Sequence, residues 1–356
     1  MAIIGNKVVS EIMALIGARL PAGWKKRSFA VSSRGEKGFR PGFVCEIREP
    51  GGKVSRLMIE ARSSLEPRDV PFLKEQLAGY VRAAGPNAVP LIASSFLSRS
   101  VRRRLAEAGI SYADGTGNMR IVSASPALYI ETPGADRNPD RTERPARSLK
   151  GAKAGRIVRA LCDAMPPFST RKLAGSVGVN AGYLSRVMGF LESEGLIERR
   201  RRGPIVMVHW RRLIERWAED YSFSGSNRVV PYLEPKDIAT LPRRLSSAAK
   251  RLAITGSAAA AAVAPVAPTR LVAAYVESPE NVARELGLRP AESGGNVLLA
   301  EPYDPVVFEK TSEAAGVRLA ALSQVAVDLM TGPGRGPAEA QALLDWMQKN
   351  ESAWRN

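Results

Sequence analysis

The sequence predicts an α/β protein of several domains. In the first and last thirds of the chain, segments with the apolar spacing of amphipathic helices alternate with short strand-like runs, whereas the stretch between them is mainly helical. Residues 133–150 are polar, rich in proline, arginine and aspartate, and typical of a linker. The 356 residues are enough for two or three hydrophobic cores. We therefore expect domains at residues 1–132, 151–220 and 221–356.

Residues 1–132 carry mixed helix and strand patterns. The pattern predicts a helix at 7–16, strands at 43–48 and 56–62 joined by a turn at 49–53, a helix at 71–82, a strand at 88–93, a helix at 98–108, a strand at 110–113 and a tight turn at 115–118.

This order of elements resembles the core of the PD-(D/E)xK restriction-endonuclease-like fold. The residues that carry the resemblance are Glu60 and Arg62, on one strand, and Gln76, on the helix that follows. The resemblance implies that active members bind magnesium through that acid and an aspartate of the preceding strand, while a lysine helps the attacking water. Here Arg62 stands in the place of the lysine, and Pro41-Gly42 in that of a Pro-Asp pair. Arginine does not release its proton, and one carboxylate is a weak magnesium site. We expect a degenerate site that binds no metal.

Residues 152–220 predict a winged helix-turn-helix. Residues 152–164 and 170–177, with Ser169 as N-cap, form the first two helices, and Asn180 caps the third. In that third helix Leu184, Val187, Met188 and Leu191 recur at helical spacing and are expected to face the core. The opposite face holds small residues and one cation, which suits close approach to a DNA groove: Ala181, Gly182, Ser185, Arg186 and Gly189.

A hairpin is expected to follow, with strands at 196–199 and 205–208 and a turn that carries four arginines. Such a wing lies along the phosphate backbone or enters the minor groove. The residues expected to contact DNA are Asn180, Tyr183, Ser185, Arg186, Arg199, Arg200, Arg201 and Arg202. For Tyr183, which borders the core face, packing is the alternative. For the whole module, the alternative is a protein-interaction role.

Residues 221–356 return to alternating helix and strand signals. Gly256-Ser257 opens an alanine-rich helix and residues 270–276 form a strand. This resembles the start of a nucleotidyltransferase fold, whose Gly-Ser turn holds nucleotide phosphates and whose next strand carries two metal-binding acids. Ala273 and Ala274 lie where those acids are needed, so we expect a degenerate domain without transfer chemistry. The last helix is expected at 338–347.

Charge and composition narrow the function. The net charge is +17, and it divides into +10 for residues 1–130, +7 for 131–220 and zero for 221–356, which favours a polyanion as partner of the first 220 residues.

Two cysteines and one histidine argue against disulfides, zinc and histidine-based catalysis, and no cofactor is expected. No apolar run approaches the roughly 20 residues of a membrane span, and the N-terminus lacks signal-peptide features. These features predict a cytoplasmic protein without a membrane partner.

Three segments together resemble the AbiEi-type antitoxins and regulators of type IV toxin–antitoxin systems: residues 108–118, the winged helix, and residues 323–329 with the glycine-rich turn after them. The resemblance implies a non-enzymatic repressor that binds double-stranded DNA, with a C-terminal domain that acts on a protein partner. A palindromic operator would imply a homodimer. Two alternatives stay open: a metal-dependent DNA nuclease that uses Glu60, and a first domain that senses single-stranded DNA and switches the winged helix.

Overall fold

The computed structural model describes residues 2–30, 42–136, 138–139, 148–200, 203–292 and 294–355. The chain divides into two compact units, Met1–Arg144 and Pro145–Asn356, which we call unit 1 and unit 2. Both combine helices with a curved seven-stranded sheet, so the α/β multidomain class expected from the sequence is confirmed. Within the described residues, no helix is both long enough and apolar enough to cross a membrane.

Unit 1 is built on a sheet with its strands in sequence order, β1 to β7. Strands β3, β4 and β5 run parallel, whereas every other neighbouring pair in this sheet is antiparallel. Its elements are α1 (Ala2–Gly17), β1 (Lys25–Ala30), β2 (Phe43–Arg48), β3 (Val54–Arg62), η1 (Pro67–Asp69), α2 (Val70–Ala84), β4 (Ala88–Ser94), α3 (Arg99–Glu107), β5 (Ser111–Asp114), β6 (Met119–Ala124) and β7 (Ala127–Thr132).

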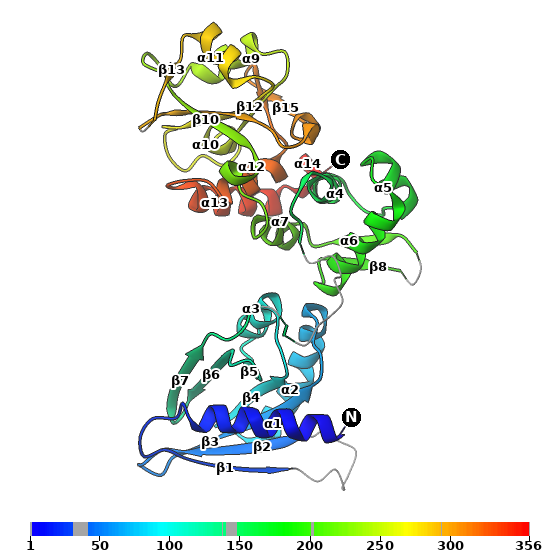
Figure 1. Ribbon diagram of the computed structural model, residues 1–356, viewed down its shortest axis with the longest axis vertical. Helices are drawn as coiled ribbons and strands as arrows, with labels where there is room; N and C mark the ends of the chain where they lie inside the picture. The colour runs from blue at the N-terminus through cyan, green and yellow to red at the C-terminus, as the bar shows by residue number, and fades with distance from the viewer. Residues whose placement is uncertain are drawn as a thin grey trace. The chain divides into compact units, whose positions relative to one another are not determined.

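Helices cover both faces of this sheet (Figure 1). Because successive strand residues point to opposite faces, each strand contributes to two cores. Ile12 and Ile16 of α1 pack with Leu57 and other residues on one face, and Leu77 of α2 packs with Met58 on the other. The sequence predicted the helices and strands of this unit up to β5, except β1, and it also missed β6 and β7.

Unit 2 begins with three helices and a hairpin, followed by a fourth helix: α4 (Ala152–Cys162), α5 (Thr170–Ser176), α6 (Ala181–Ser193), β8 (Ile197–Arg199), β9 (Ile205–Val208) and α7 (Trp210–Ala218). The second sheet follows, in the order β13-β10-β14-β12-β11-β16-β15. In this sheet β12–β14 and β11–β16 are the parallel pairs.

The remaining elements of unit 2 are α8 (Phe223–Ser226), β10 (Arg228–Leu233), α9 (Leu241–Ala248), β11 (Leu252–Thr255), α10 (Gly256–Ala260), β12 (Val272–Val276), α11 (Pro279–Leu286), β13 (Arg289–Pro290), β14 (Val297–Glu301), η2 (Pro305–Phe308), β15 (Ser312–Ala314), β16 (Val317–Leu319), α12 (Leu322–Met330), α13 (Gly336–Lys349) and α14 (Glu351–Trp354). Helices α9 and α11 lie on one side of the sheet, and α10, α12 and α13 on the other (Figure 1).

One hydrophobic cluster runs through the whole of unit 2. It contains Leu184 and Val187 of α6, Trp217 of α7, Ile254 of β11 and Val325 of α12. The three-helix segment and the second sheet therefore share a core, so that their relative arrangement is fixed by packing.

Candidate nucleic-acid interface

Helix α6 presents two unlike faces. Leu184, Val187, Met188 and Leu191 are buried in the core of unit 2, as their spacing predicted. The opposite face is exposed and consists of Ala181, Gly182, Ser185, Arg186 and Gly189. An added Cβ at Gly189 would meet no atom within 4 Å. This face is therefore narrow and open, with one guanidinium at its centre.

Asn180 and Tyr183 stabilise the first turn of this helix. The Asn180 side chain accepts a hydrogen bond of 2.8 Å from the backbone N–H of Tyr183, which is the N-cap that the sequence predicted. Tyr183 is half-buried against the core, and the guanidinium carbon of Arg186 lies 5.9 Å from the centroid of its ring. Burial raises the pKa of Tyr183, and Arg186 partly offsets this. Tyr183 thus packs inward and also supports Arg186.

Helix α5 makes fewer stabilising contacts than α6. Ser169 occupies its N-cap position, but its side chain makes no capping hydrogen bond, contrary to the role expected for it. Leu173 is the only residue of α5 that is buried. Gly178, with φ of +62°, makes the turn from α5 into α6.

The hairpin after α6 is an antiparallel pair with a bulge at Arg199. Arg199 is half-buried and Arg200 exposed, and the N–H of Gly203 donates to the carbonyl of Arg200 at 2.7 Å. Arg201 and Arg202 lie outside the described residues. The backbone of Phe168 exchanges two hydrogen bonds with Ile205, of 2.9 and 3.0 Å. That third strand-like contact connects the hairpin to the segment before α5, and it was not predicted from the sequence.

In unit 1, Glu60, Arg62 and Gln76 lie together. Arg62 forms an ion pair of 3.1 Å with Glu60 and donates a hydrogen bond of 3.2 Å to the Gln76 oxygen, while Gln76 donates to Tyr80 at 2.8 Å. Burial raises the pKa of Glu60, and the charge of Arg62 partly counteracts the rise. The guanidinium of Arg62 therefore occupies the position beside the Glu60 carboxylate that a metal ion would use.

The position of the neighbouring strand that lies level with Glu60 holds no second acid. Phe43 of β2 pairs with Ile59 of β3, so that Gly42 comes level with Glu60. An added Cβ at Gly42 would meet nothing within 4 Å. Among the described residues, no group of three or more His, Cys, Asp or Glu side chains is arranged to hold a metal ion.

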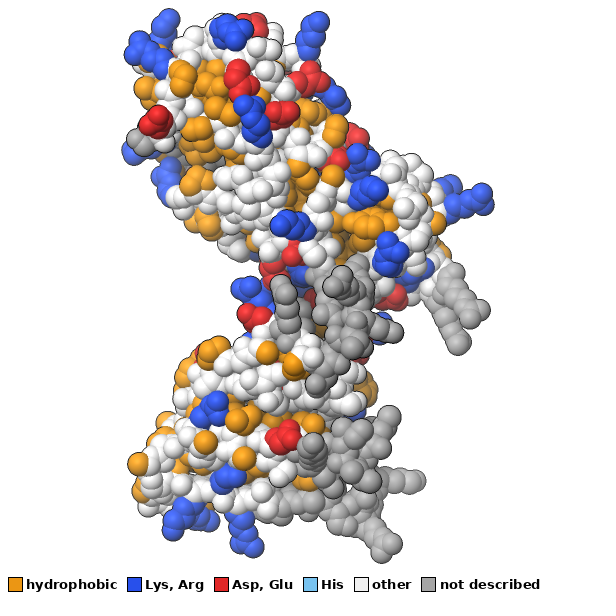
Figure 2. Space-filling model, in the orientation of Figure 1, with side chains coloured by type: hydrophobic (Ala, Val, Ile, Leu, Met, Phe, Trp, Pro, Cys, Tyr) orange, Lys and Arg blue, Asp and Glu red, His pale blue; other side chains and the backbone are white. Residues whose placement is uncertain are grey.

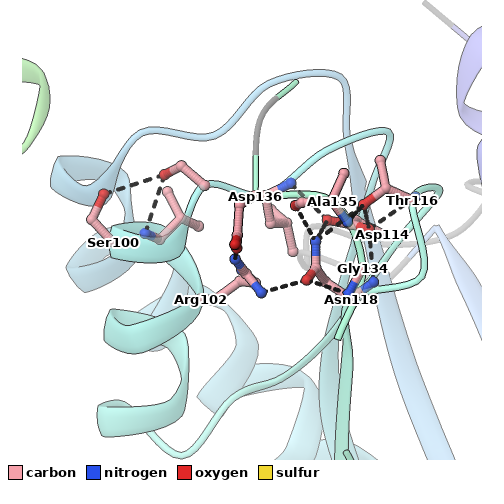
Figure 3. Close-up of polar contacts among 11 residues, drawn as sticks. Ser100, Arg102, Asp114, Thr116, Asn118, Gly134, Ala135 and Asp136 are labelled. Atoms are coloured by element: carbon pink, nitrogen blue, oxygen red, sulfur yellow. Dashed lines mark hydrogen bonds and ion pairs between the residues drawn. The ribbon is translucent and has the colours of Figure 1, made fainter. Parts of the chain in front are cut away.

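The turn after β5 is organised by the buried Asp114 (Figure 3). Its carboxylate accepts hydrogen bonds from the backbone N–H groups of Leu97, Thr116 and Asn118, and from the Thr116 and Asn118 side chains, at 2.7–3.1 Å. Asn118 also accepts from Arg102 and from the N–H of Gly134. This motif, taken from the sequence as a family marker, thus joins three loops at the carboxyl end of β5.

In unit 2, the Gly256-Ser257 turn is occupied by the protein itself. Ser257 donates a hydrogen bond to the buried carboxylate of Glu339, and an added Cβ at Gly256 would lie 3.5 Å from the Ala273 side chain. Gly256 has φ of +65°. The Ser257 hydroxyl at this turn is therefore engaged by a carboxylate of α13.

Buried polar contacts connect α4 to α12. Arg159 bonds Asp163 at 2.7 Å and Gln324 at 3.3 Å, and Asp163 accepts from Ser323. All four side chains are buried. Gln324 donates onward to Asp328 at 2.9 Å. The sequence missed this connection, although Ser323, Gln324 and Asp328 all belong to the segment 323–329 that it singled out.

Comparison with known proteins gives one family match. Residues 206–348 match the model described as "Transcriptional regulator, AbiEi antitoxin, Type IV TA system". The resemblance proposed from the sequence is therefore confirmed over that part of the chain, and a regulator role is supported. No curated protein and no solved structure matched the chain. The matched residues begin in β9 and end in α13.

Proposed function

Taking as premise that residues 206–348 match the family of AbiEi-type transcriptional regulators, we propose that the chain binds duplex DNA sequence-specifically through a winged helix-turn-helix of residues 151–220. The observation that carries the proposal is the exposed face of α6, with Ser185 and Arg186 set among Ala181, Gly182 and Gly189. Small residues let a helix enter the major groove, and Ser and Arg side chains bond base edges there.

The wing supplies the second contact of this proposal. Arg199 and Arg200 lie at the end of β8, and the sequence continues with Arg201 and Arg202. Four cations in succession repel one another, and a phosphate backbone or a narrow minor groove relieves that repulsion. Asn180 and Tyr183 complete the set, as cap of the reading helix and support of Arg186.

Unit 1 takes part, in this proposal, as a restriction-endonuclease-like domain that binds without cutting. Two features support a non-catalytic role: Arg62 is paired with Glu60, and Gly42 stands level with Glu60. In the same way, Glu339 at the Gly256-Ser257 turn supports a nucleotidyltransferase-like fold that no longer holds phosphates. Residues 221–356, whose net charge is zero, are the part of the chain that we assign to binding a protein partner.

A gel shift with a fragment of the promoter of the protein's own gene tests the proposal. Specific binding is expected for the wild-type chain, and Arg186→Ala should weaken it by roughly tenfold to a hundredfold, as loss of a base contact does. Arg200→Ala should lower affinity for all sequences and reduce the salt dependence, as loss of a phosphate contact does. Arg243→Ala, an exposed arginine of α9, is the matched control.

Two outcomes would contradict the proposal. The first is equal binding of promoter and scrambled duplex by the wild-type chain. The second is a loss for Arg243→Ala as large as that for Arg186→Ala. Magnesium-dependent cleavage of plasmid DNA that disappears in Glu60→Ala would separately overturn the non-catalytic role of unit 1.

A further inference from the structure

The outer strands of the unit 1 sheet carry a group of cations on one face. The register pairs Lys25 with Arg48, and Arg27 with Glu46, which in turn pairs with Arg56. Paired residues of neighbouring strands point to the same side, so all five side chains share a face. We call these five residues the β1–β3 face.

The face is open to solvent. Lys25, Arg27, Arg48 and Arg56 are exposed, and only Glu46 is half-buried. Further along the same strands, Val44 and Met58 pack beneath the helices of that side. Figure 2 shows Lys and Arg side chains projecting from the part of unit 1 that carries β1 in Figure 1.

The charges of this face are not balanced within it. Arg56 forms an ion pair of 3.1 Å with Glu46, the one acid among the five. Lys25 and Arg48 lie directly opposite each other on antiparallel strands. Like charges in that position destabilise a sheet, so the pair carries a cost that an external anion would remove.

The spacing of the cations suits a dense polyanion. Three strands span about 10 Å across the face, since neighbouring strands lie about 4.8 Å apart. Duplex DNA carries one charge per roughly 1.7 Å of axis, and therefore about six phosphates over that length. Lysines on β1 alone would be explained as protection of an edge strand, but Arg48 and Arg56 belong to inner strands.

We propose that the β1–β3 face binds the phosphate backbone of duplex DNA without regard to sequence. It extends the DNA-binding function proposed above with a second contact, on the other unit of the chain. Lys25 and Arg48 contribute one phosphate contact each, and the Arg56–Glu46 pair holds the neighbouring side chains in place.

The test uses the full chain with Lys25→Ala and Arg48→Ala combined, and a scrambled duplex as probe. Affinity should fall by roughly eightfold per lost contact at 0.1 M salt, and the slope of log affinity against log salt should become shallower by about 1.8. Thermal stability should change little, because the variant removes the repulsion between the two side chains together with the exposed hydrogen bond from Arg48 to the Gly52 carbonyl. Lys74→Ala with Arg99→Ala, two exposed cations of α2 and α3, is the control of equal charge.

The proposal is overturned if the face variant binds like the wild-type chain, or if the control variant loses as much affinity and slope as the face variant. Aggregation of the face variant with unchanged DNA affinity would also overturn it, in favour of edge protection. These outcomes are separate from those for α6, because that proposal depends on the preference for promoter over scrambled duplex.

Discussion

Asp328 is a buried acid of unit 2 whose ionisation is constrained by its surroundings. It is buried and accepts hydrogen bonds from Thr255, Tyr275, Tyr221 and Gln324, at 2.6–2.9 Å. Burial raises its pKa from the ordinary 3.8 to about 6, although the four donors oppose the rise. The folded chain thus holds a proton on Asp328 at a pH where the unfolded chain has released it.

This predicts a pH dependence of stability that belongs to one residue. The contribution of Asp328 is fully present below about pH 4 and is lost as pH rises through about 6, so the free energy of unfolding should fall by roughly 1–2 kcal/mol between pH 5 and 7.5. Asp328→Asn, which cannot ionise, should lose that part of the slope. Urea unfolding followed by tryptophan fluorescence measures it, because four of the five tryptophans lie in unit 2. Parallel pH profiles for the two proteins would contradict this assignment.

At the scale of elements, α6 combines a buried side fixed by packing with an exposed side that packing leaves free. Gly189 is within the helix and faces open space, so it costs roughly 1 kcal/mol of helix stability relative to alanine. Gly189→Leu should therefore raise the melting temperature of the chain. It should also weaken binding to the promoter duplex by at least tenfold, because the new side chain would separate the helix from the groove.

A matched substitution separates these two effects. Gly79 lies in α2 of unit 1, and an added Cβ there also meets nothing within 4 Å. Gly79→Leu should gain similar helix stability and leave promoter binding unchanged. Melting by circular dichroism and binding by fluorescence anisotropy measure both quantities. If Gly189→Leu binds the promoter as tightly as Gly79→Leu does, the exposed face of α6 does not approach DNA.

Local signals predicted most of these elements. The bounds of α6 follow from the Asn180 cap and the spacing of Leu184 and Leu191, which depend on neighbouring residues alone. Strand β1 was missed because its exposed residues, including Lys25 and Arg27, lack the apolar alternation of a half-buried strand. In strand β6 burial alternates, but apolar Val122 is exposed and polar Ser123 is buried, so the residue types themselves do not alternate and the strand was missed.

At the scale of the molecule, the sequence predicted which part of the chain carries the excess positive charge. It did not predict the contacts that join distant segments within unit 2. Arg159 and Gln324 are separated by 165 positions, and Cys162 and Arg355 by 193. Such pairs leave no periodic pattern, since they depend on the fold that brings them together. The Glu60 and Arg62 pair was within reach, because the two residues share one strand.

The last of these long-range contacts predicts that the end of the chain stabilises the three-helix segment. Arg355 is buried and donates to the backbone carbonyls of Leu161, Cys162 and Ala164, at the end of α4, over 2.8–3.1 Å. Those carbonyls have no partner within a helix. Arg355→Ala would leave them buried without a donor, at a cost of about 1–3 kcal/mol for each unsatisfied group. Lysine cannot span the three acceptors and should restore only part of the loss.

Hydrogen exchange of residues 152–164 measures this effect where it acts. In Arg355→Ala, exchange there should accelerate at least tenfold, and the free energy of unfolding of unit 2 should fall by several kcal/mol. Arg211→Ala is the control, because its ion pair of 2.8 Å with Asp345 lies on the surface near the same end of the chain, where such pairs contribute little. Equal, small losses for both variants would mean that Arg355 does not stabilise α4. A loss confined to Arg355→Ala would make Arg355, whose guanidinium also bonds Glu351, a structural part of the proposed DNA-binding module.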